Sequence, residues 1–406
     1  YRPLTALLWK LEYALWGLDL IGYQLVNFLL HTGCALLVRC LALQIFPKVQ
    51  RVSLVAALIF LFQPGHIFGI LMISALTGLL CTLFYLAAVV AYLQGREGRR
   101  TKKLLGLACF LLALLTKELA LSLPLLICAW EAIYLCAENR FHWRAWLVAW
   151  LPYGLVAALY LLFRYVLFGQ MPSSPLHEHT TPLHLLINLA TYAAKCFAPW
   201  GLEDLKPLLR GRPLLLAAIS AAGLALGAGI LWRWRRVLVS GHLFGLTFFI
   251  VSVLPVITLY SPWNTYLPSA GIALTLGSAL SWSRSGFRRG ALIVFLALSI
   301  SYSLNHQRNW RRARDLCSEV ATAVARLEAP GPLYLANLPA EWNEVPLFIS
   351  DWALKNTLIL QHRSRDVSAL ANVVKTQQQE QLEIVVLGPS RFTLRLTDPK
   401  DFFRLD

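Results

Sequence analysis

The stretch Leu104–Cys136, LLGLACFLLALLTKELALSLPLLICAWEAIYLC, decides how this chain folds. It is almost wholly apolar, yet Lys117, Glu118 and Pro124 lie near its middle. One helix of this length, at about 1.5 Å per residue, would overrun a hydrocarbon core of about 30 Å. We therefore expect two short helices, with both charges at the turn between them on one membrane face. Because charges are costly against lipid, the turn is expected to face a polar cavity.

The rest of the chain has the composition of a polytopic membrane protein. Of its 406 residues, 57% are hydrophobic and only 14% are charged. Apolar runs of about 20 residues recur along most of it and predict an all-α bundle, since alternating barrel segments are absent. The net charge of +16 fits Lys and Arg gathered in cytoplasmic loops, so nucleic acid is not predicted as a partner.

About ten spans are expected if Tyr1 lies outside, and the charges between them follow the positive-inside rule. The candidates are 22–45, 53–70, 74–94, 104–116, 119–136, 146–168, 213–232, 241–260, 264–282 and 290–304. The predicted inner loops carry Lys48, Arg51, Arg96, Arg99, Arg100, Lys102, Lys103, Arg140, Arg144, Arg233, Arg235, Arg236, Arg284, Arg288 and Arg289. The cluster of Arg308, Arg311, Arg312 and Arg314 departs from the rule. Either it contacts lipid phosphates outside, which we favour, or one span is miscounted.

Three segments are expected outside the hydrocarbon core. Tyr1–Ile21 mixes aromatic and charged residues and predicts a juxtamembrane helix in the interface. The outer loop 169–212 contains HLLINLATYAAKCF, whose apolar spacing predicts a second interfacial helix. From 305 to 406 the sequence predicts a small α/β module on the periplasmic side. Its expected elements are a helix at Trp310–Leu327, helical structure around Asp351–Gln381, and strands in PLYLANLP, LEIVVLGP and RFTLRLT. We expect this module to dock onto the membrane domain or to cover it.

Neither a disulfide framework nor a metal site is predicted. Most of the eight cysteines lie in or beside apolar runs, and no CxxC occurs. His177, His179 and His184 match no standard zinc spacing, and histidines in loops are usually solvated.

Three segments together resemble one family. They are YRPLT with WGLDLIGYQLVNFLLH (Trp16–His31), LLTKELALSLPLLI (Leu114–Ile127) and SPWNTYLPSAGIAL (Ser261–Leu274). In order and spacing they are similar to segments of the protein O-mannosyltransferases with luminal tetratricopeptide tails, and of their bacterial relatives, in the GT-C glycosyltransferase superfamily. The resemblance covers about residues 1–315 and implies a GT-C-like transmembrane domain at 1–304.

The resemblance implies a polyprenyl- or dolichyl-phosphate sugar as donor and no bound cofactor. Such transfer needs a carboxylate near the acceptor and cations around the phosphate leaving group. Lys117 is the predicted phosphate contact. Glu118 is expected to orient Lys117 or to bind the sugar, unless the two form an ion pair that holds the turn. Arg2 is expected either to contact a phosphate of the donor or to anchor the chain at the membrane–water interface.

Other candidate site residues come from the first and third segments of the resemblance and from FQPGH. His66 resembles the second histidine of the family's HPxH segment, with Gln63 at the first, and a structural role is its alternative. Asn264 and Tyr266 are predicted near the sugar or lipid, although Tyr266 also suits an interfacial aromatic belt. Asn27 and His31 share a helix face and are expected to hydrogen-bond between helices.

The sequence also departs from the family pattern. The diacidic loop would lie upstream of Tyr1, so the catalytic acid is not predicted in this chain. Family acids and arginines are replaced near Phe68 and by Leu76, Pro262 and Trp263. No 34-residue period follows residue 305, so a tetratricopeptide tail is not expected. These losses leave the sugar, the acceptor and activity itself open.

Three functions remain. A membrane glycosyltransferase acting at the outer face is favoured, because the polar residues gather there. A transporter or flippase would predict internal repeats, and none is visible. A non-catalytic relative that binds a lipid-linked substrate is the third reading. We predict a bacterial inner membrane, with the endoplasmic reticulum as alternative; the absence of any N-x-Ser/Thr site agrees weakly with the former.

Overall fold

The structure is a computed structural model that describes residues 2–96, 98–137, 142–169, 181–197, 240–258 and 260–326, together with segments 333–338, 341–342, 345–347, 367–371, 382–388 and 391–396. The chain divides into two compact units, Tyr1–Tyr302 and Ser303–Asp406. Several predictions lie outside the described residues: the span at 213–232, most of the loop 169–212 with His177 and His179, and most of Asp351–Gln381.

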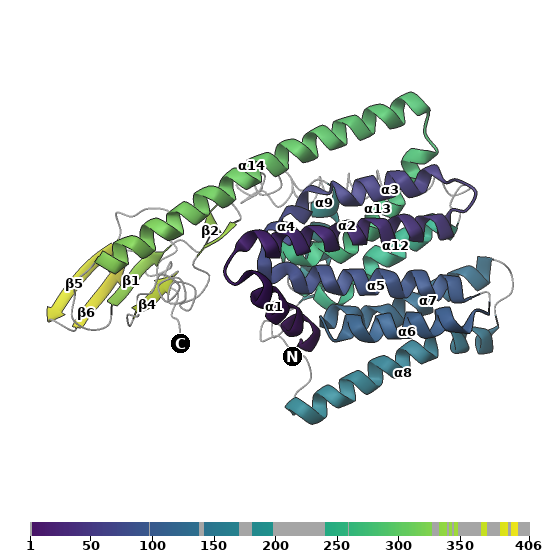
Figure 1. The fold of residues 1–406 in the computed structure, drawn as a ribbon, viewed down its shortest axis with the longest axis horizontal. Coiled ribbons are helices and arrows are strands. Elements are labelled where there is room, and N and C mark those ends of the chain that lie inside the picture. The colour runs from purple at the N-terminus through teal and green to yellow at the C-terminus, as the bar shows by residue number, and fades with distance from the viewer. Residues whose placement is uncertain are drawn as a thin grey trace. The chain divides into compact units, whose positions relative to one another are not determined.

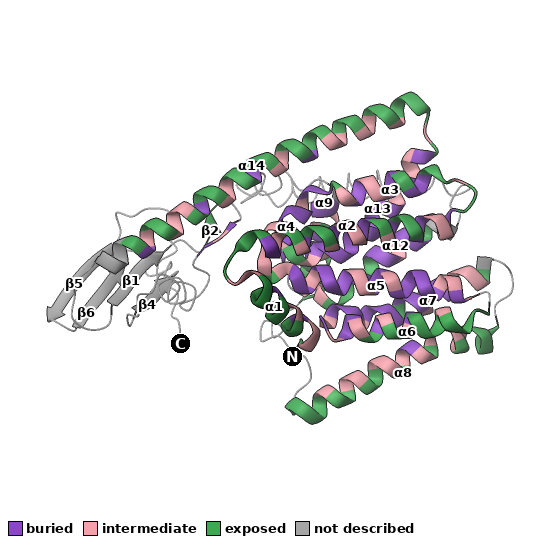
Figure 2. Cartoon of the chain, in the orientation of Figure 1, coloured by how far each residue is buried: buried purple, intermediate pink, exposed green. Residues whose placement is uncertain are grey.

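The first unit is an all-α bundle with an apolar interior. Its main helices are α2 (Leu20–Ile45), α3 (Arg51–Leu61), α5 (Leu76–Gly95), α6 (Arg100–Leu114), α7 (Leu123–Ala137), α8 (Trp143–Phe168), α12 (Ser240–Val253) and α13 (Tyr266–Ser281) (Figure 1). Buried residues gather where the helices face one another (Figure 2). Helices α12 and α13 approach closely through Gly245 and Gly271, where a Cβ would collide with the facing backbone. Small residues at such contacts are typical of helices packed in membranes.

Five described helical segments are long and apolar enough to cross a membrane: α2, Ile73–Gly95, Glu118–Cys136, α8, and Ser285–Thr322 of α14 (Ser285–Arg326). A sixth is added if α3 and the following Pro64–Leu71, bent by 50°, form one span. The described helices therefore have the length and composition of an all-α membrane bundle, but the predicted count of about ten spans is not confirmed. Helices α6 and α13, with 15 and 16 residues, are shorter than the about 20 residues that span a bilayer.

The central stretch forms the expected hairpin. Helix α6 ends at Leu114, and the N–H of Lys117 and the hydroxyl of Thr116 both donate to the Ala113 carbonyl, at 3.1 and 2.6 Å. Lys117 is extended, with φ −157° and ψ 142°, before the short 3-10 helix η3 (Glu118–Ser122). Pro124 lies in the first turn of α7, where its missing N–H costs nothing.

Two shorter helices have the character expected of interfacial segments. Helix α1 (Pro3–Trp16) buries Thr5 and Glu12 and exposes Leu7, Leu11 and Leu15. Helix α9 (Pro182–Phe197), which contains HLLINLATYAAKCF, buries Tyr192 and exposes apolar side chains on its other face. An outward apolar face on a helix at the bundle's edge suits the boundary between headgroups and acyl chains.

The second unit contains the three predicted strands, and it also contains a strand at Val367–Ala371, where the sequence predicts helical structure. β1 (Leu333–Leu338) pairs in parallel with β4 (Val367–Ala371), β5 (Leu382–Gly388) pairs antiparallel with β6 (Arg391–Leu396), and β2 (Glu341–Trp342) pairs antiparallel with β3 (Val345–Pro346). The α/β module as a whole stays a prediction. The span predicted at 290–304 and the helix predicted at Trp310–Leu327 are joined in α14. On it, Arg312 and Arg314 pair with Glu319 and Asp315, at 3.2 and 2.9 Å.

Candidate functional site

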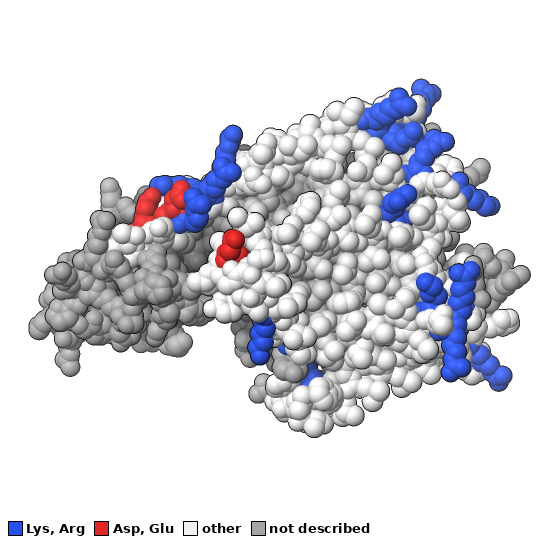
Figure 3. All heavy atoms as spheres, in the orientation of Figure 1, with Lys and Arg blue, Asp and Glu red and all other residues white. Residues whose placement is uncertain are grey.

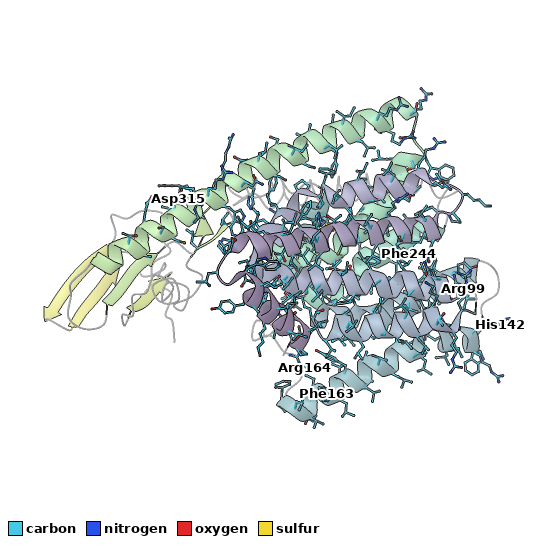
Figure 4. All side chains as sticks on the ribbon, in the orientation of Figure 1. Arg99, His142, Phe163, Arg164, Phe244 and Asp315 are labelled. Carbon is cyan, nitrogen blue, oxygen red and sulfur yellow. The ribbon has the colours of Figure 1, made fainter. Side chains whose placement is uncertain are left out.

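A cavity of about 600 Å³ lies at the end of the bundle where α6 turns into η3. Its walls come from Arg2, the start of α5, the Lys117–Leu119 turn, Arg164 of α8, and Trp263 and Asn264 of η6 (Pro262–Thr265). Figure 4 places Arg164 at this end and Arg99 and His142 at the other. On the face shown in Figure 3, most Lys and Arg side chains gather at the opposite end. The cavity therefore collects its cations where basic residues are scarce.

Glu118 is held by two arginines from distant parts of the chain. Its Oε1 accepts a hydrogen bond from Arg164 Nη1 at 2.5 Å, and its Oε2 accepts one from Arg2 Nη2 at 3.3 Å. Within the described part of the chain, Glu118 and Lys117 form no ion pair with each other, so the alternative of a Lys–Glu pair holding the turn is wrong. Instead, the carboxylate fixes two guanidinium groups at the cavity wall.

Lys117 is left without an acidic partner at ion-pair distance among the described residues. Its Nζ donates to Asn264 Oδ1 at 2.8 Å. An ammonium has three donors, so further N–H groups remain for a ligand in the cavity. Burial lowers the pKa of Lys117 below the ordinary value of 10.5, because the charged form loses hydration. An anion beside it would restore that lost solvation.

Tyr266 and His66 lie behind the cavity rather than in its wall. Tyr266 is 5% exposed, and its hydroxyl lies 2.6 Å from His31 Nδ1. Because His31 Nε2 must donate to the Leu61 carbonyl, 3.0 Å away, Nδ1 accepts from Tyr266. His66 is buried, with Nε2 2.8 Å from Ser269 Oγ. The structure thus brings Lys117, Glu118, Arg2 and Asn264 together but not these two.

The Tyr266–His31 contact predicts a stability effect. Tyr266→Phe removes the hydroxyl and leaves His31 Nδ1 buried without a donor, which costs about 1–3 kcal/mol. Thermal unfolding in detergent should show a lower midpoint for this variant. Tyr13→Phe is the matched control, because Tyr13 is exposed, and it should leave the midpoint unchanged. Equal midpoints for both variants would show that the buried contact contributes nothing.

The other predicted residues have structural partners. Asn27 Nδ2 lies 3.3 Å from the carbonyls of Ile70 and Met72, as expected for contacts between segments. Gln63 Nε2 donates to the carbonyl of Cys196 at 2.9 Å, close to the end of α9. No group of three or more His, Cys, Asp or Glu side chains that could hold a metal occurs among the residues the structure describes. His177 and His179, for which no metal site is predicted, lie outside the described residues.

Sequence reasoning missed Arg164 and, as a wall residue, Trp263. Arg164 lies in the penultimate turn of the apolar helix α8. A lone arginine inside an apolar span is costly unless it finds a partner or a polar cavity, and that signal could have identified it. Trp263 had only been noted as a departure from the family pattern. No sequence signal indicated that it would stand beside Asn264 in the wall.

The chain is similar to known protein O-mannosyl-transferases over about a third of its length or less. The chain is 32% identical over 114 residues to human protein O-mannosyl-transferase TMTC4, covering 25% of this chain. It is 30% identical over 169 residues to Drosophila melanogaster protein O-mannosyl-transferase Tmtc3, covering 35% of this chain. The chain is related to the TMTC protein O-mannosyl-transferases. The matched segments make up 15% and 18% of those relatives' own lengths. No protein-family model and no solved structure matches this TMTC-related chain.

Proposed function

We propose that this chain is the membrane part of a GT-C-type glycosyltransferase that binds a polyprenyl-phosphate-linked sugar in the cavity and passes the sugar to an acceptor. The observation that carries the proposal is the half-buried Lys117 ammonium, bonded to Asn264 and facing no carboxylate partner in the described chain. Arg2 and Arg164 add two further cations to the same cavity. Relatives named as mannosyl-transferases support sugar transfer as the reaction class.

The charged residues of the cavity would have different roles in the reaction. When the bond between sugar and phosphate breaks, negative charge grows on the phosphate, and nearby cations stabilise that change. Lys117 would meet the phosphate directly, since it has unused N–H donors. Glu118 would act on the arginines, holding Arg2 and Arg164 in place. Trp263 offers an exposed ring beside Asn264, which suits stacking and hydrogen bonding to a sugar.

The described cavity wall supplies no obvious base. Glu118 is its one carboxylate, and both of its oxygens accept hydrogen bonds from arginines. A carboxylate held in this way is a weak proton acceptor. The group that activates the acceptor hydroxyl is therefore placed outside the described wall. The same observation favours a second candidate, a protein that binds the lipid-linked sugar without transferring it.

We place the protein in a bacterial inner membrane, with the cavity and the C-terminal unit on the periplasmic side. Arg99, one of the predicted inner-loop cations, lies at the opposite end of the bundle from Arg164 (Figure 4). That asymmetry suits a cytoplasmic location for the basic end.

Donor binding measured across pH tests the proposal. Purified protein should bind polyprenyl-phosphate mannose and should not bind the free polyprenol, which has no phosphate. Only protonated Lys117 attracts phosphate, so binding is present below its pKa and lost above it. Because that pKa is lowered, binding should weaken at a more acidic pH than an ordinary lysine would give. Lys117→Arg keeps its charge and should retain binding at alkaline pH.

Two results would count against this assignment. The first is equal binding of the phosphate donor and of the free alcohol, which would leave no role for the cations. The second is the same alkaline decline in the wild type and in Lys117→Arg, which would place the titrating group elsewhere. Binding of the donor without any transfer to added acceptors would favour the binding protein over the enzyme.

A further inference from the structure

A second cavity, of about 780 Å³, lies at the basic end of the bundle and takes no part in the proposed reaction. It is lined by the ends of α2 and α5, by the link that follows α5, and by α7. Its polar and aromatic wall residues are Gln44, Gln94, Arg96, Arg99, Trp130 and Tyr134. Figure 4 places Arg99 at this end, where Lys and Arg gather on the face shown in Figure 3.

Arg96 is fixed in the wall of this cavity from two directions. Its Nε lies 2.8 Å from Glu131 Oε1, and its Nη2 lies 3.3 Å from Oε2. Its guanidinium carbon lies 3.6 Å from the centre of the Tyr134 ring. Glu131 is in turn bonded to the Tyr92 hydroxyl. A guanidinium has five N–H donors, so one edge faces Glu131 and Nη1 remains available to a ligand.

The other described residues of the wall add hydrogen-bond donors and no carboxylate. Trp130 is buried, and its indole N–H has no partner among the described residues. Arg99 is exposed at the rim, and the side-chain amides of Gln44 and Gln94 provide further N–H groups. No carboxylate belongs to the described lining of this cavity. Its chemistry is that of a receptor for a phosphate group, which accepts many hydrogen bonds and carries negative charge.

We propose that this second cavity binds the phosphate headgroup of an anionic phospholipid from the leaflet at the basic end of the bundle. The cavity lies where apolar helices end, which is the level of lipid headgroups. Tyr134 and Trp130 are the aromatic types that favour this depth. Basic pockets between membrane helices recognise lipid phosphates in the same way. A lipid source also explains why the pocket opens beside apolar helices rather than on a soluble surface.

Lipid retention by the full chain tests the proposal. The protein is exchanged into nanodiscs that contain phosphatidylcholine with increasing phosphatidylglycerol, and bound lipid is measured by native mass spectrometry. The wild type should retain phosphatidylglycerol preferentially. Arg99→Ala should weaken retention by about tenfold or more, because a charge-assisted contact is lost. Arg100→Ala is the matched control: Arg100 is the exposed neighbour outside the cavity, and only the general surface effect, less than about fivefold, is expected.

A third variant tests the interior of the cavity. Trp130→Phe keeps an aromatic ring but removes the unpartnered N–H, and should also weaken phosphatidylglycerol retention. Equal losses of phosphatidylglycerol retention in Arg99→Ala and Arg100→Ala would show only a general attraction between basic residues and anionic lipid. That result would overturn the proposed binding site. Inorganic phosphate is added as a competitor. If it displaces the lipid, and if it binds the lipid-free protein as tightly as the lipid does, the ligand is a soluble phosphate and the lipid assignment is overturned.

Discussion

Lys117→Ala is expected to abolish sugar transfer and to weaken donor binding by about tenfold to a hundredfold. That range corresponds to the about 1.5–3 kcal/mol of a hydrogen bond to a charged group. The effect is large because Lys117 is the cavity cation that faces no carboxylate in the described chain, whereas Arg2 and Arg164 share Glu118. Binding of labelled polyprenyl-phosphate mannose to the purified variant measures it.

The fold of the Lys117→Ala variant should survive, and its stability is the informative control. A lowered pKa means that the folded state holds the Lys117 proton less tightly than the unfolded state does. Charged Lys117 therefore opposes folding at neutral pH, and this penalty falls as pH rises above the folded-state pKa and is gone above the unfolded-state pKa. Removing the side chain should leave the free energy of unfolding unchanged or raised while donor binding weakens. Lys48→Ala removes an exposed lysine and should alter neither quantity. A Lys117→Ala protein with wild-type donor affinity would remove Lys117 from the mechanism.

The hairpin and its polar turn could be predicted because both depend on local chemistry. Two adjacent charges and Pro124 interrupt an apolar run that is too long for one span, and no neighbouring segment is needed to reach that conclusion. The partners of the turn could not be predicted in the same way. Arg2 and Glu118 are 116 residues apart, and nothing in the sequence specifies that contact. The prediction that Glu118 orients Lys117 took neighbours in sequence to be partners in space.

Tyr266 shows a second limit of sequence reasoning. Asn264, from the same motif, lines the cavity wall, but Tyr266 does not. The direction of Tyr266 depends on which face of α13 points inward, and almost every residue in the first half of that helix is buried. A helix that is apolar on all sides has no periodicity from which to read its orientation. His31 on α2 was therefore needed to explain where the Tyr266 hydroxyl goes.

The second large effect is expected at the ion pair that fixes Arg96. Arg96→Leu should destabilise the fold by about 3–5 kcal/mol, because it leaves a buried carboxylate with no cationic partner. The Glu131 side chain is 5% exposed, and among the described residues only the Tyr92 hydroxyl would still bond to it. Thermal or denaturant unfolding in detergent measures the change. The same substitution removes a wall residue of the second cavity, so lipid retention by this variant is not used to test that site.

A double replacement separates the cost of an orphaned charge from the value of the pair. In Arg96→Leu with Glu131→Leu both charges are gone, neither has to be desolvated, and stability should return close to that of the wild type. The exposed pair of Arg312 and Glu319, whose side chains are 52% and 62% accessible, is the matched control. Arg312→Leu should cost less than about 1 kcal/mol, because water solvates the partner that remains. Equal losses for Arg96→Leu and for the double variant would mean that Arg96 stabilises the fold by packing against Tyr134 rather than by neutralising Glu131.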